Sequence, residues 1–275
     1  MDTAKLLVFA SGSLEGGGSG FENLVHSMGT GILDATIVAV VSNYEHGGVR
    51  KRADKLGIPF IHFPKPWTAE RYQLIAQDSG AQFFALSGWL KRVIGLDPCF
   101  TFNIHPGPLP EFGGHGMYGH HVHEAVMAAF SHGEITHSAV CMHFATSQYD
   151  EGPIFFRFNI IIHEDDTPDS LGARVNVLEH RWQPEITNLV VHREIQWDGE
   201  NPNSLILPAR YEIEHWEEKQ STTESIYPRR PEAIQRSLGY FFVKNANKIP
   251  PLESGISEKI IKIIPFSSTD LQRHG

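Results

Sequence analysis

The sequence predicts an α/β fold in which a doubly wound, mostly parallel sheet is covered by helices on both faces. From residue 5 to residue 196, short β-rich runs alternate with helical segments, which is the pattern of a layered α/β domain. The early strands are nearly continuous apolar runs, such as residues 36–41, and this is typical of parallel strands buried on both faces. The 275 residues suit one large domain, or one domain with an appendage.

The elements follow one another along the chain with clear turn residues between them. Runs rich in β-branched and aromatic residues predict strands at residues 6–10, 35–42, 59–63, 82–86, 100–104, 138–144 and 153–162. Apolar residues at helical spacing predict helices at residues 21–28, 47–56, 68–79, 119–130 and 168–191. The last helix has the clearest start, because Thr167 can cap it and both Pro168 and Asp169 suit its first turn.

The chain changes character after residue 197. Residues 198–203 form a turn-rich break, and the residues beyond them lack a sustained period. We therefore expect a domain at residues 1–197 and a C-terminal extension of unknown role at residues 198–275. The extension carries 10 Lys and Arg against 11 Asp and Glu, whereas a tail that grips RNA should be clearly basic. Its apolar patches at residues 240–243 and 260–264 either add strands or pair with a partner.

Composition and charge exclude several classes of protein. The formal net charge of −9 argues against nucleic acid or an anionic membrane as a partner, since proteins that bind them usually carry positive charge. No apolar stretch approaches the ~20 residues of a membrane span, and no signal region precedes the first strand, so we expect a cytoplasmic protein. Cys99 and Cys141 lack the spacing of a disulfide framework or a structural zinc site. Chemistry on a small molecule fits best.

A glycine-rich loop at residues 11–20 joins the first strand to the first helix. Glycines let the backbone approach a ligand closely, and the amides at a helix N-terminus favour an anion. In a doubly wound sheet this loop opens at the carboxyl edge, where such folds bind ligands. No lysine follows the glycines as a P-loop requires, and the spacing misses the dinucleotide fingerprint. We expect a phosphate site at Gly18, Ser19 and Gly20, with a flexible crossover loop as the structural alternative.

A second motif closes the predicted strand at residues 100–104. Asn103 and His105 lie two residues apart, so in an extended chain their side chains leave the same face, and Pro106 disfavours helical geometry at His105. An amide donor and a protonated imidazole together suit a reaction in which negative charge appears on a carbonyl oxygen. The structural alternative is a strand end that carries two satisfied polar groups.

The turn at residues 147–153 offers an acid. Asp150 could hydrogen-bond His105, raise its pKa and relay protons through water, although adjacent acids such as Asp150 and Glu151 are often solvated turn residues. His120 and His123 would share a helix face, which makes a metal pair conceivable. The short run has no nearby Cys and no HExxH pattern, so we expect no metal.

These three motifs, in this order, resemble those of the 10-formyltetrahydrofolate-dependent formyltransferases. Within that group the resemblance is closest to the phosphoribosylglycinamide formyltransferases of purine biosynthesis, and it covers residues 6–197. It implies a Rossmann-like formyltransferase fold, with 10-formyltetrahydrofolate as cosubstrate and no metal. It also implies that a formyl group passes from N10 of the folate to the primary amine of glycinamide ribonucleotide.

The resemblance assigns roles to individual residues. The catalytic Asn, His and Asp of the family match Asn103, His105 and Asp150: the first two would stabilise a tetrahedral oxyanion, and Asp150 would hold His105 protonated and assist proton transfer. Folate contacts are implied for Gly88, Trp89, Leu90, Lys91, Ala145, Thr146, Ser147 and Tyr149. Acceptor contacts are implied for Gly18, Ser19, Gly20, Pro106, Gly107 and Glu179.

The acceptor half departs from the family pattern. The first loop is lengthened by residues 14–17, and Gly20 stands where the family has Asn. The family's phosphate-contacting arginine has Lys65 and Arg71 as its candidates here. The acceptor therefore stays open, and another amine such as an amino sugar is an alternative to glycinamide ribonucleotide.

Other classes of function also stay open. A 10-formyltetrahydrofolate hydrolase and a non-catalytic folate-binding protein would both keep the folate pocket. Formyl transfer to methionyl-tRNA is disfavoured because the extension is not basic. The expected partners are small molecules, namely folate and a phosphorylated amine, with no nucleic acid and no membrane, and a homodimer is left open.

Overall fold

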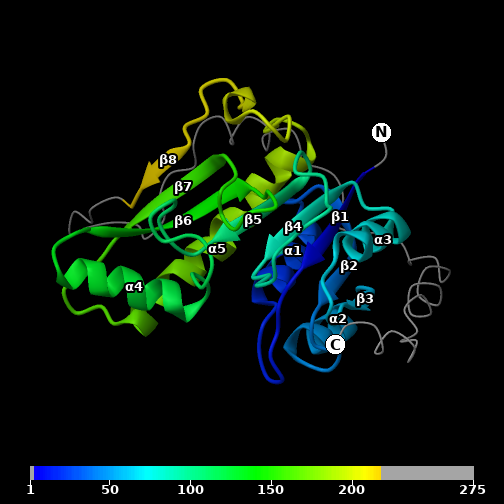
Figure 1. The fold of residues 1–275 in the computed structure, drawn as a ribbon, viewed down its shortest axis with the longest axis horizontal. Helices are drawn as coiled ribbons and strands as arrows, with labels where there is room; N and C mark the ends of the chain where they lie inside the picture. Colours follow the sequence, from blue (N-terminus) through cyan, green and yellow to red (C-terminus); the bar gives the residue numbers. More distant parts are fainter. Residues whose placement is uncertain (1–2, 218–275) are drawn as a thin grey trace, which may run out of the picture. The chain divides into compact units, whose positions relative to one another are not determined.

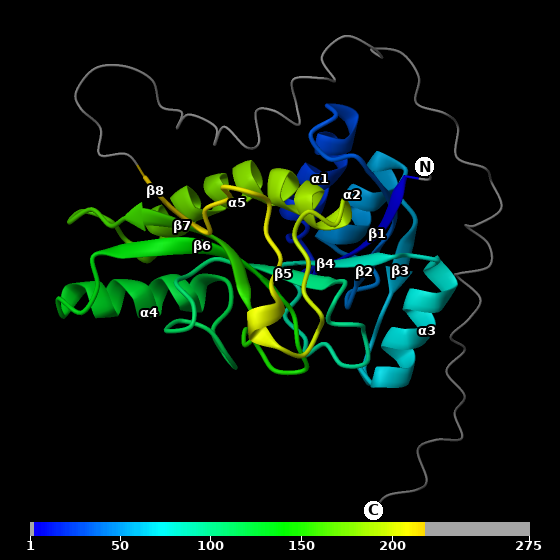
Figure 2. The same ribbon diagram turned by 90° about the horizontal axis from the view of Figure 1, so that it is seen from above.

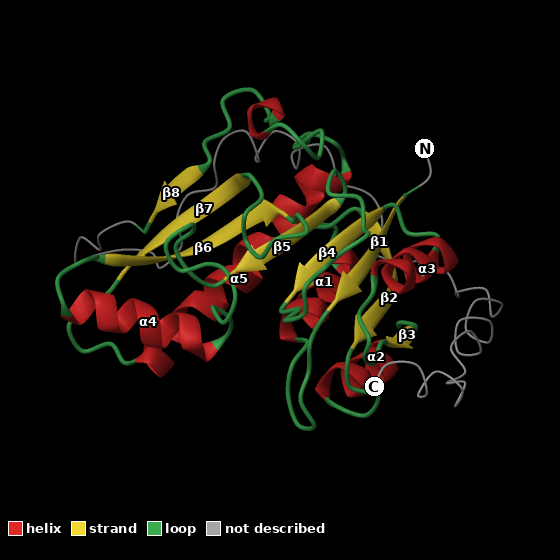
Figure 3. Ribbon diagram, viewed as in Figure 1, coloured by secondary structure: helices red, strands yellow, loops and turns green. Residues whose placement is uncertain are grey.

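An eight-stranded sheet forms the centre of the protein in a computed structural model that describes residues 3–217. The strand order is β3-β2-β1-β4-β5-β6-β7-β8, as Figures 1 and 3 show. The strands are β1 Ala4–Phe9, β2 Ala35–Ser42, β3 Phe60–His62, β4 Phe83–Ser87, β5 Thr101–His105, β6 His137–Phe144, β7 Ile154–Ile161 and β8 Glu214–Trp216. Strands β1 to β5 run parallel, while β6 is antiparallel to both β5 and β7.

Helices cover both faces of this sheet. Their bounds are α1 Ser19–Gly29, α2 Gly48–Leu56, α3 Ala69–Ser79, α4 His120–Ser131 and α5 Pro168–Val191. Figure 2 shows α1, α2 and α5 on one face and α3 and α4 on the other. The expected doubly wound, mostly parallel α/β fold is therefore confirmed. Because strand β1 is covered on both faces, Leu6, Leu7, Val8 and Phe9 are all fully buried, which explains its continuous apolar sequence.

The described part of the segment after residue 197 continues the sheet. Strand β8 pairs parallel to β7, and the Tyr211 hydroxyl donates to the Phe155 carbonyl at 2.8 Å. The sequence analysis missed β8, because a strand of three residues has no detectable period. The domain limit at residue 197 stays a prediction, and the apolar patches at residues 240–243 and 260–264 lie outside the described residues. No helix within residues 3–217 is long and apolar enough to cross a membrane.

Helix α5 is joined to helix α1 by a hydrogen bond to a backbone carbonyl that a proline leaves free. The helix begins as predicted, with Thr167 accepting from the Ser170 backbone N–H in a capping box. Pro184 lies inside it and has no N–H, so the carbonyl of His180, four residues earlier, loses its helical partner. The Asn23 side chain of α1 donates to that carbonyl at 2.6 Å. This bond holds the middle of α5 against the start of α1.

Candidate active site

The three residues of the predicted catalytic trio meet at the end of strand β5. In the antiparallel pairing of β5 with β6, Asn103 lies opposite His143. Asp150 comes from the turn between β6 and β7, in a left-handed conformation with φ of 56° that non-glycine residues rarely adopt. The Asn103 side chain donates to Asp150 Oδ1 at 3.3 Å, and His105 Nδ1 lies 3.8 Å from Asp150 Oδ2. The fold therefore brings the three predicted side chains together, and their catalytic role stays a prediction.

Asp150 lies at the centre of a network of polar contacts. The Gly114 N–H donates to its Oδ2 at 3.0 Å, and His143 Nε2 lies 3.4 Å from its Oδ1. Burial alone would raise the pKa of the Asp150 carboxyl, but the His143 ring, the His105 charge and the Gly114 N–H hold that pKa below its usual value. Asp150 is therefore ionised at neutral pH and available to accept a proton.

His105 is subject to opposing effects of burial and of its neighbours. Its Nε2–H donates to the Phe112 carbonyl at 2.8 Å, and 3% of the residue is exposed. Burial lowers the pKa of His105 below its usual value, and the opposing effects of the Asp150 charge and the Phe112 carbonyl do not restore it. The ring nitrogens both face acceptors, the Phe112 carbonyl and the Asp150 carboxylate, so the expectation that Asp150 keeps His105 protonated stays a prediction.

The sequence analysis did not assign a role to His143. Its Nδ1 lies 2.8 Å from the Phe144 carbonyl, which can only accept, so Nδ1 carries a hydrogen. In a neutral ring Nε2 then accepts from the Asn103 amide, 3.1 Å away. A proton arriving on Nε2 would redirect it to donate to Asp150. The available signal was a polar residue within the apolar second part of strand β6, residues 139–144.

A cavity beside the trio, the turn cavity, lies between the end of β4 and the turn after β6. It is lined by Leu86, Trp89, Lys91, Arg92, Val93, Asn103, His143, Ala145, Thr146, Gln148, Tyr149 and Asp150. Five of the expected folate contacts, Trp89, Lys91, Ala145, Thr146 and Tyr149, are among them. Three others are not: Gly88 lines a different cavity, Leu90 points outward with 37% exposed, and Ser147 accepts from Arg92 through its carbonyl. Arg92 and Gln148 were missed.

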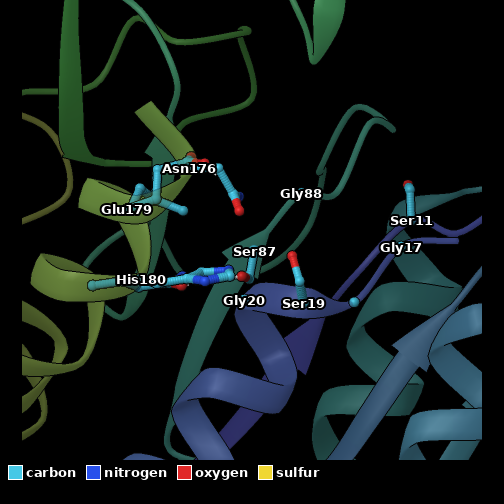
Figure 4. Close-up of a pocket in the computed structure, with 12 residues that line it drawn as sticks. Ser11, Gly17, Ser19, Gly20, Ser87, Gly88, Asn176, Glu179 and His180 are labelled. Carbon is cyan, nitrogen blue, oxygen red and sulfur yellow. Dashed lines mark hydrogen bonds between the residues drawn. The ribbon is translucent and has the colours of Figure 1, made fainter. Parts of the chain in front are cut away.

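The glycine-rich loop borders a second cavity of about 190 Å³, the glycine-loop cavity. Figure 4 shows α5 residues on one wall and the start of α1 on the other. The lining residues are Ser11, Gly17, Gly18, Ser19, Gly20, Ser87, Gly88, Ile104, Asn176, Glu179, His180 and Gln183. The expected acceptor contacts Gly18, Ser19, Gly20 and Glu179 are thus brought together. Sequence reasoning missed Ser87, Asn176, His180 and Gln183.

Neighbouring residues at the carboxyl ends of β4 and β5 line the two cavities. Leu86 and Asn103 face the turn cavity, while Ser87 and Ile104 face the glycine-loop cavity. Strands β1 and β4 are parallel neighbours. The chain adds β2 and β3 on one side of β1 and then adds β4 and β5 on the other side, so the strand order reverses at this point. Ligands of doubly wound folds bind at such a switch point, outside the carboxyl ends of the strands.

Of the residues that lengthen the first loop, only Gly17 lines the glycine-loop cavity. Gly12 and Gly17 form an isolated antiparallel bridge, and the Ser13 N–H donates to the Gly16 carbonyl at 3.0 Å, so the insertion folds into a small hairpin. Glu15 is exposed at the tip of this hairpin and does not line the cavity. The lengthened loop therefore keeps its acid away from the expected phosphate site.

Neither candidate for the phosphate-contacting arginine lines the glycine-loop cavity. Arg71 donates to the carbonyls of Pro64 and Pro66, and Lys65 lies over the Trp67 ring. Arg52 is a cation close to the glycines, because its Cδ lies 3.5 Å from the position that a Cβ would take at Gly18. Its Nε pairs with the Glu22 carboxylate at 3.1 Å.

Glu179 borders both the glycine-loop cavity and a third cavity of about 320 Å³. Its carboxyl keeps access to the cavities, yet the surrounding protein raises its pKa to about 7, and the hydrogen bond from Asn176 offsets this only in part. The third cavity is lined by Pro106, Gly119, His120, His123, Pro168, Asp169, Gly172, Asn176 and Glu179.

Gly107 was an expected acceptor contact, but it does not line any of these three cavities. It packs against α4, where a Cβ would meet Val122 at 2.4 Å. His120, which the sequence analysis considered with His123 as a pair of metal ligands, lies 3.4 Å from both Glu124 and Asp169. Within residues 3–217 no group of three or more His, Cys, Asp or Glu side chains could hold a metal ion.

Sequence comparison relates the chain to known enzymes. Residues 4–187 match the formyl transferase family. The chain is 31% identical over 204 residues to a chloroplastic phosphoribosylglycinamide formyltransferase of Arabidopsis thaliana, covering 70% of this chain and 67% of that protein. It is 34% identical over 221 residues to the chloroplastic enzyme of Vigna unguiculata, covering 74% and 68%. It is also 31% identical over 193 residues to the enzyme of Bacillus subtilis, covering 66% and 92%.

Solved structures share the fold. A phosphoribosylglycinamide formyltransferase from Anaplasma phagocytophilum has a TM-score of 0.64 at 22% identity, over 79% of this chain and 100% of that one. A formyltetrahydrofolate deformylase from Pseudomonas syringae has a TM-score of 0.60 at 17% identity, over 75% and 66%, so the fold alone does not separate transfer from hydrolysis. The family match and the sequence relatives decide the lineage: the chain belongs to the formyl transferase family and is a folate-dependent formyltransferase.

Proposed function

We propose that the protein transfers the formyl group of 10-formyltetrahydrofolate to the primary amine of glycinamide ribonucleotide, in purine biosynthesis. The observation that carries this proposal is the meeting of Asn103, His105 and Asp150 at the end of β5, where Asn103 lines the turn cavity and the next residue, Ile104, lines the glycine-loop cavity. The relatives named phosphoribosylglycinamide formyltransferases, at 31–34% identity, support the choice of acceptor.

The proposed chemistry assigns a step to each member of the trio. The amine attacks the formyl carbon, and negative charge develops on the formyl oxygen. Asn103 donates to that oxygen, and because both of its amide hydrogens now face Asp150 and His143, one of them must turn to the substrate. Ionised Asp150 takes the proton from the attacking amine and delivers it, directly or through water, to the departing N10.

His105 supports this step from behind Asp150. Burial lowers its pKa while the Asp150 charge acts in the opposite direction, and its Nδ1 lies 3.8 Å from Asp150 Oδ2, near enough to pair with it when protonated. A proton shared between His105 and Asp150 would stabilise the oxyanion electrostatically without leaving a lone charge in a buried site. The trio therefore works as a coupled unit.

The acceptor would lie in the glycine-loop cavity. The amides of Ser19 and Gly20 begin helix α1, which has 11 residues, so the helix N-terminus favours a phosphate there. Glu179, on the opposite wall, is placed to accept hydrogen bonds from the ribose hydroxyls. Pro106 follows His105 and lines the third cavity, and it would border the reacting amine.

The experiment that tests this function is an assay of the purified protein with 10-formyltetrahydrofolate and one acceptor at a time. Glycinamide ribonucleotide should yield one formylated amine for each tetrahydrofolate released, and an amino sugar should yield much less. Folate release without a formylated amine would make the protein a hydrolase. Folate binding without turnover on any acceptor would make it a binding protein.

The location and assembly of the protein belong to the same proposal. We propose a cytoplasmic enzyme that binds small molecules and neither nucleic acid nor membrane, with the homodimer left open. The compartment varies among relatives, because the plant enzymes are named chloroplastic. The division into a domain at residues 1–197 and an extension at residues 198–275 is likewise a proposal.

A further inference from the structure

Gly20 has no room for a side chain. A Cβ at this position would lie 2.3 Å from Ser87 Oγ and 3.1 Å from Gln183 Oε1. The residue lies in the first turn of α1, with no positive φ, so backbone conformation does not require glycine there. The space is instead taken by two polar side chains from β4 and α5, both of which line the glycine-loop cavity. Gly20, Ser87 and Gln183 are therefore one coupled set.

Gln183 is buried but incompletely bonded. It is 2% exposed, and its Oε1 accepts from Ser87 Oγ at 3.2 Å. Its amide nitrogen makes no hydrogen bond within residues 3–217, although the residue lines the cavity. Nε2 is not among the fully buried polar atoms, so it is reached from the cavity, where a ligand or a water can accept its hydrogens. With the Ser87 hydroxyl donating to Oε1, Nε2 is the end of the amide that is left to face the cavity.

The same wall carries a second unpartnered nitrogen. His180 Nε2 is buried without a hydrogen-bond partner, and its ring lies beside Gly20 and Ser87 in Figure 4. The bond from Asn23 to the His180 carbonyl holds this part of α5 in place. Burial and the Arg52 charge lower the pKa of His180, and the Glu22 charge acts in the opposite direction. Glu179 is the one carboxyl among the residues that line this cavity. The wall near α1 therefore offers nitrogens and backbone amides, which suit an anion.

We propose that Gln183, oriented by Ser87, is a specificity-determining residue that donates its amide N–H to a phosphate monoester seated at the N-terminus of α1. Gly20 is the residue that leaves room for it. This inference rests on the proposed function for the place of the acceptor, and it adds a side-chain ligand that the expected backbone site does not contain. The alternative is that Gln183 only fills space beside Gly20.

The test measures binding of ribose 5-phosphate and of ribose to the full chain by calorimetry. Gln183→Met keeps the length of the side chain and removes the donor, so ribose 5-phosphate should bind about tenfold more weakly, with ribose unchanged. Gln183→Glu adds a negative charge and should weaken binding by about a hundredfold. Equal ribose 5-phosphate affinity in both variants and wild type would overturn the proposal.

A matched control comes from the same helix. Thr187 lies one turn beyond Gln183, is fully buried and has an unpartnered hydroxyl, but it does not line the cavity. Thr187→Val should bind ribose 5-phosphate as wild type does. Thermal unfolding of each variant identifies any loss of affinity that comes from a loss of fold, and a variant that melts as wild type yet binds weakly supports the ligand role.

The coupling to Gly20 gives a second test. Gly20→Ala should weaken ribose 5-phosphate binding, because the new methyl group collides with Ser87 Oγ. Ser87→Ala removes that oxygen, so the double variant Gly20→Ala with Ser87→Ala should recover part of the affinity and show non-additive behaviour. If Gly20→Ala alone binds as wild type, the three residues are not coupled and the proposal fails.

Failure of this proposal and failure of the proposed function give different results. If wild type formylates glycinamide ribonucleotide while Gln183→Met leaves both its KM and the affinity for ribose 5-phosphate unchanged, only the role of Gln183 is wrong. If ribose 5-phosphate binding depends on Gln183 but no formyl transfer occurs, the proposed function is wrong. The inference that Gln183 binds a phosphate monoester is then kept. Wild type that binds ribose 5-phosphate no better than ribose would overturn the inference itself.

Discussion

The turn cavity and the glycine-loop cavity differ in how their polar groups are satisfied. At the turn cavity, Asn103, His143 and Asp150 bond one another, and His105 donates to a backbone carbonyl. At the glycine-loop cavity, His180 Nε2 and the Gln183 amide nitrogen have no partners among the described residues. The residues at the turn cavity, which we call the reacting end, thus bond one another without a ligand. The residues at the glycine-loop cavity, which we call the acceptor end, leave donors for a ligand to complete.

The sequence follows the same division. The motifs that carry the trio match the family, while the first loop, Gly20 and the residues around it depart from the pattern. We infer that the chemistry of the reacting end tolerates little change, because each group there depends on its neighbours. The acceptor end can exchange one set of donors for another as long as the anion is satisfied.

Removal of the central carboxylate should have the largest effect. Asp150→Asn keeps the size of the side chain but cannot take the amine proton, so kcat should fall by ~10² or more with the folate and acceptor affinities little changed. Steady-state kinetics with both substrates measures this. The adjacent exposed acid provides the control, since Glu151→Gln should keep the wild-type kcat. An Asp150→Asn variant with wild-type turnover would remove the proposed mechanism.

The His105→Ala variant should also lose turnover by ~10². Because the pKa values of His105 and Asp150 are both lowered, kcat/KM of wild type should be level near neutral pH and fall on the acid side as the coupled pair gains a proton. His132→Ala, at an exposed position, is the control and should leave the profile unchanged. A profile that is the same in wild type and His105→Ala would contradict the coupled unit.

Glu179 gives a prediction about stability at the acceptor end. Its pKa is raised from 4.5 to about 7 in the folded protein, so the folded state holds this proton more tightly than the unfolded state. The stability of wild type relative to Glu179→Gln should therefore decrease as the pH rises from 4.5 to 7 and stay level above that.

Thermal unfolding at pH 5 and pH 8 measures this difference. The melting temperature of wild type minus that of Glu179→Gln should be larger at pH 5. Glu164→Gln, which changes an exposed carboxyl, should show no such dependence. A difference that stays constant with pH would mean that Glu179 does not hold its proton near neutrality.

The smallest expected effect concerns the tie between α1 and α5. Asn23→Ala removes the hydrogen bond to the His180 carbonyl that Pro184 leaves free, and the free energy of unfolding should fall by about 1 kcal/mol. Chemical denaturation measures this loss. Loss of this bond should let the part of α5 that carries His180 and Gln183 shift relative to α1. The KM for the acceptor should therefore rise a few-fold while kcat is kept. A lowered kcat with an unchanged acceptor KM would show that this hydrogen bond supports the residues of the reacting end and not those of the acceptor end.

Much of the fold could be predicted because its patterns are local. Helix α5 begins at Pro168 as expected, since a cap, a proline and an acid are adjacent in sequence. The predicted strands of the sheet are confirmed to within two residues at each end. Strand β8 escaped because three residues carry no period, and its place depends on pairing with β7.

The site was predicted where the residues form motifs and missed where they meet only through the fold. His143 reaches Asn103 through antiparallel register, which a sequence does not display. Gln183 and Ser87 come from α5 and β4, and only the packing of α1 brings them to Gly20. The balance at His105 between burial, which lowers its pKa, and the Asp150 charge, which raises it, depends on the whole surrounding chain and cannot be taken from the motif.

The most direct test of the account follows the formyl carbon itself. With a ¹³C-labelled formyl group on the folate, NMR in a single turnover should show the label passing one for one into the amide of glycinamide ribonucleotide, and Asn103→Ala should slow this by ~10² or more. Label that appears as free formate in wild type, or transfer at the wild-type rate in Asn103→Ala, would contradict the account.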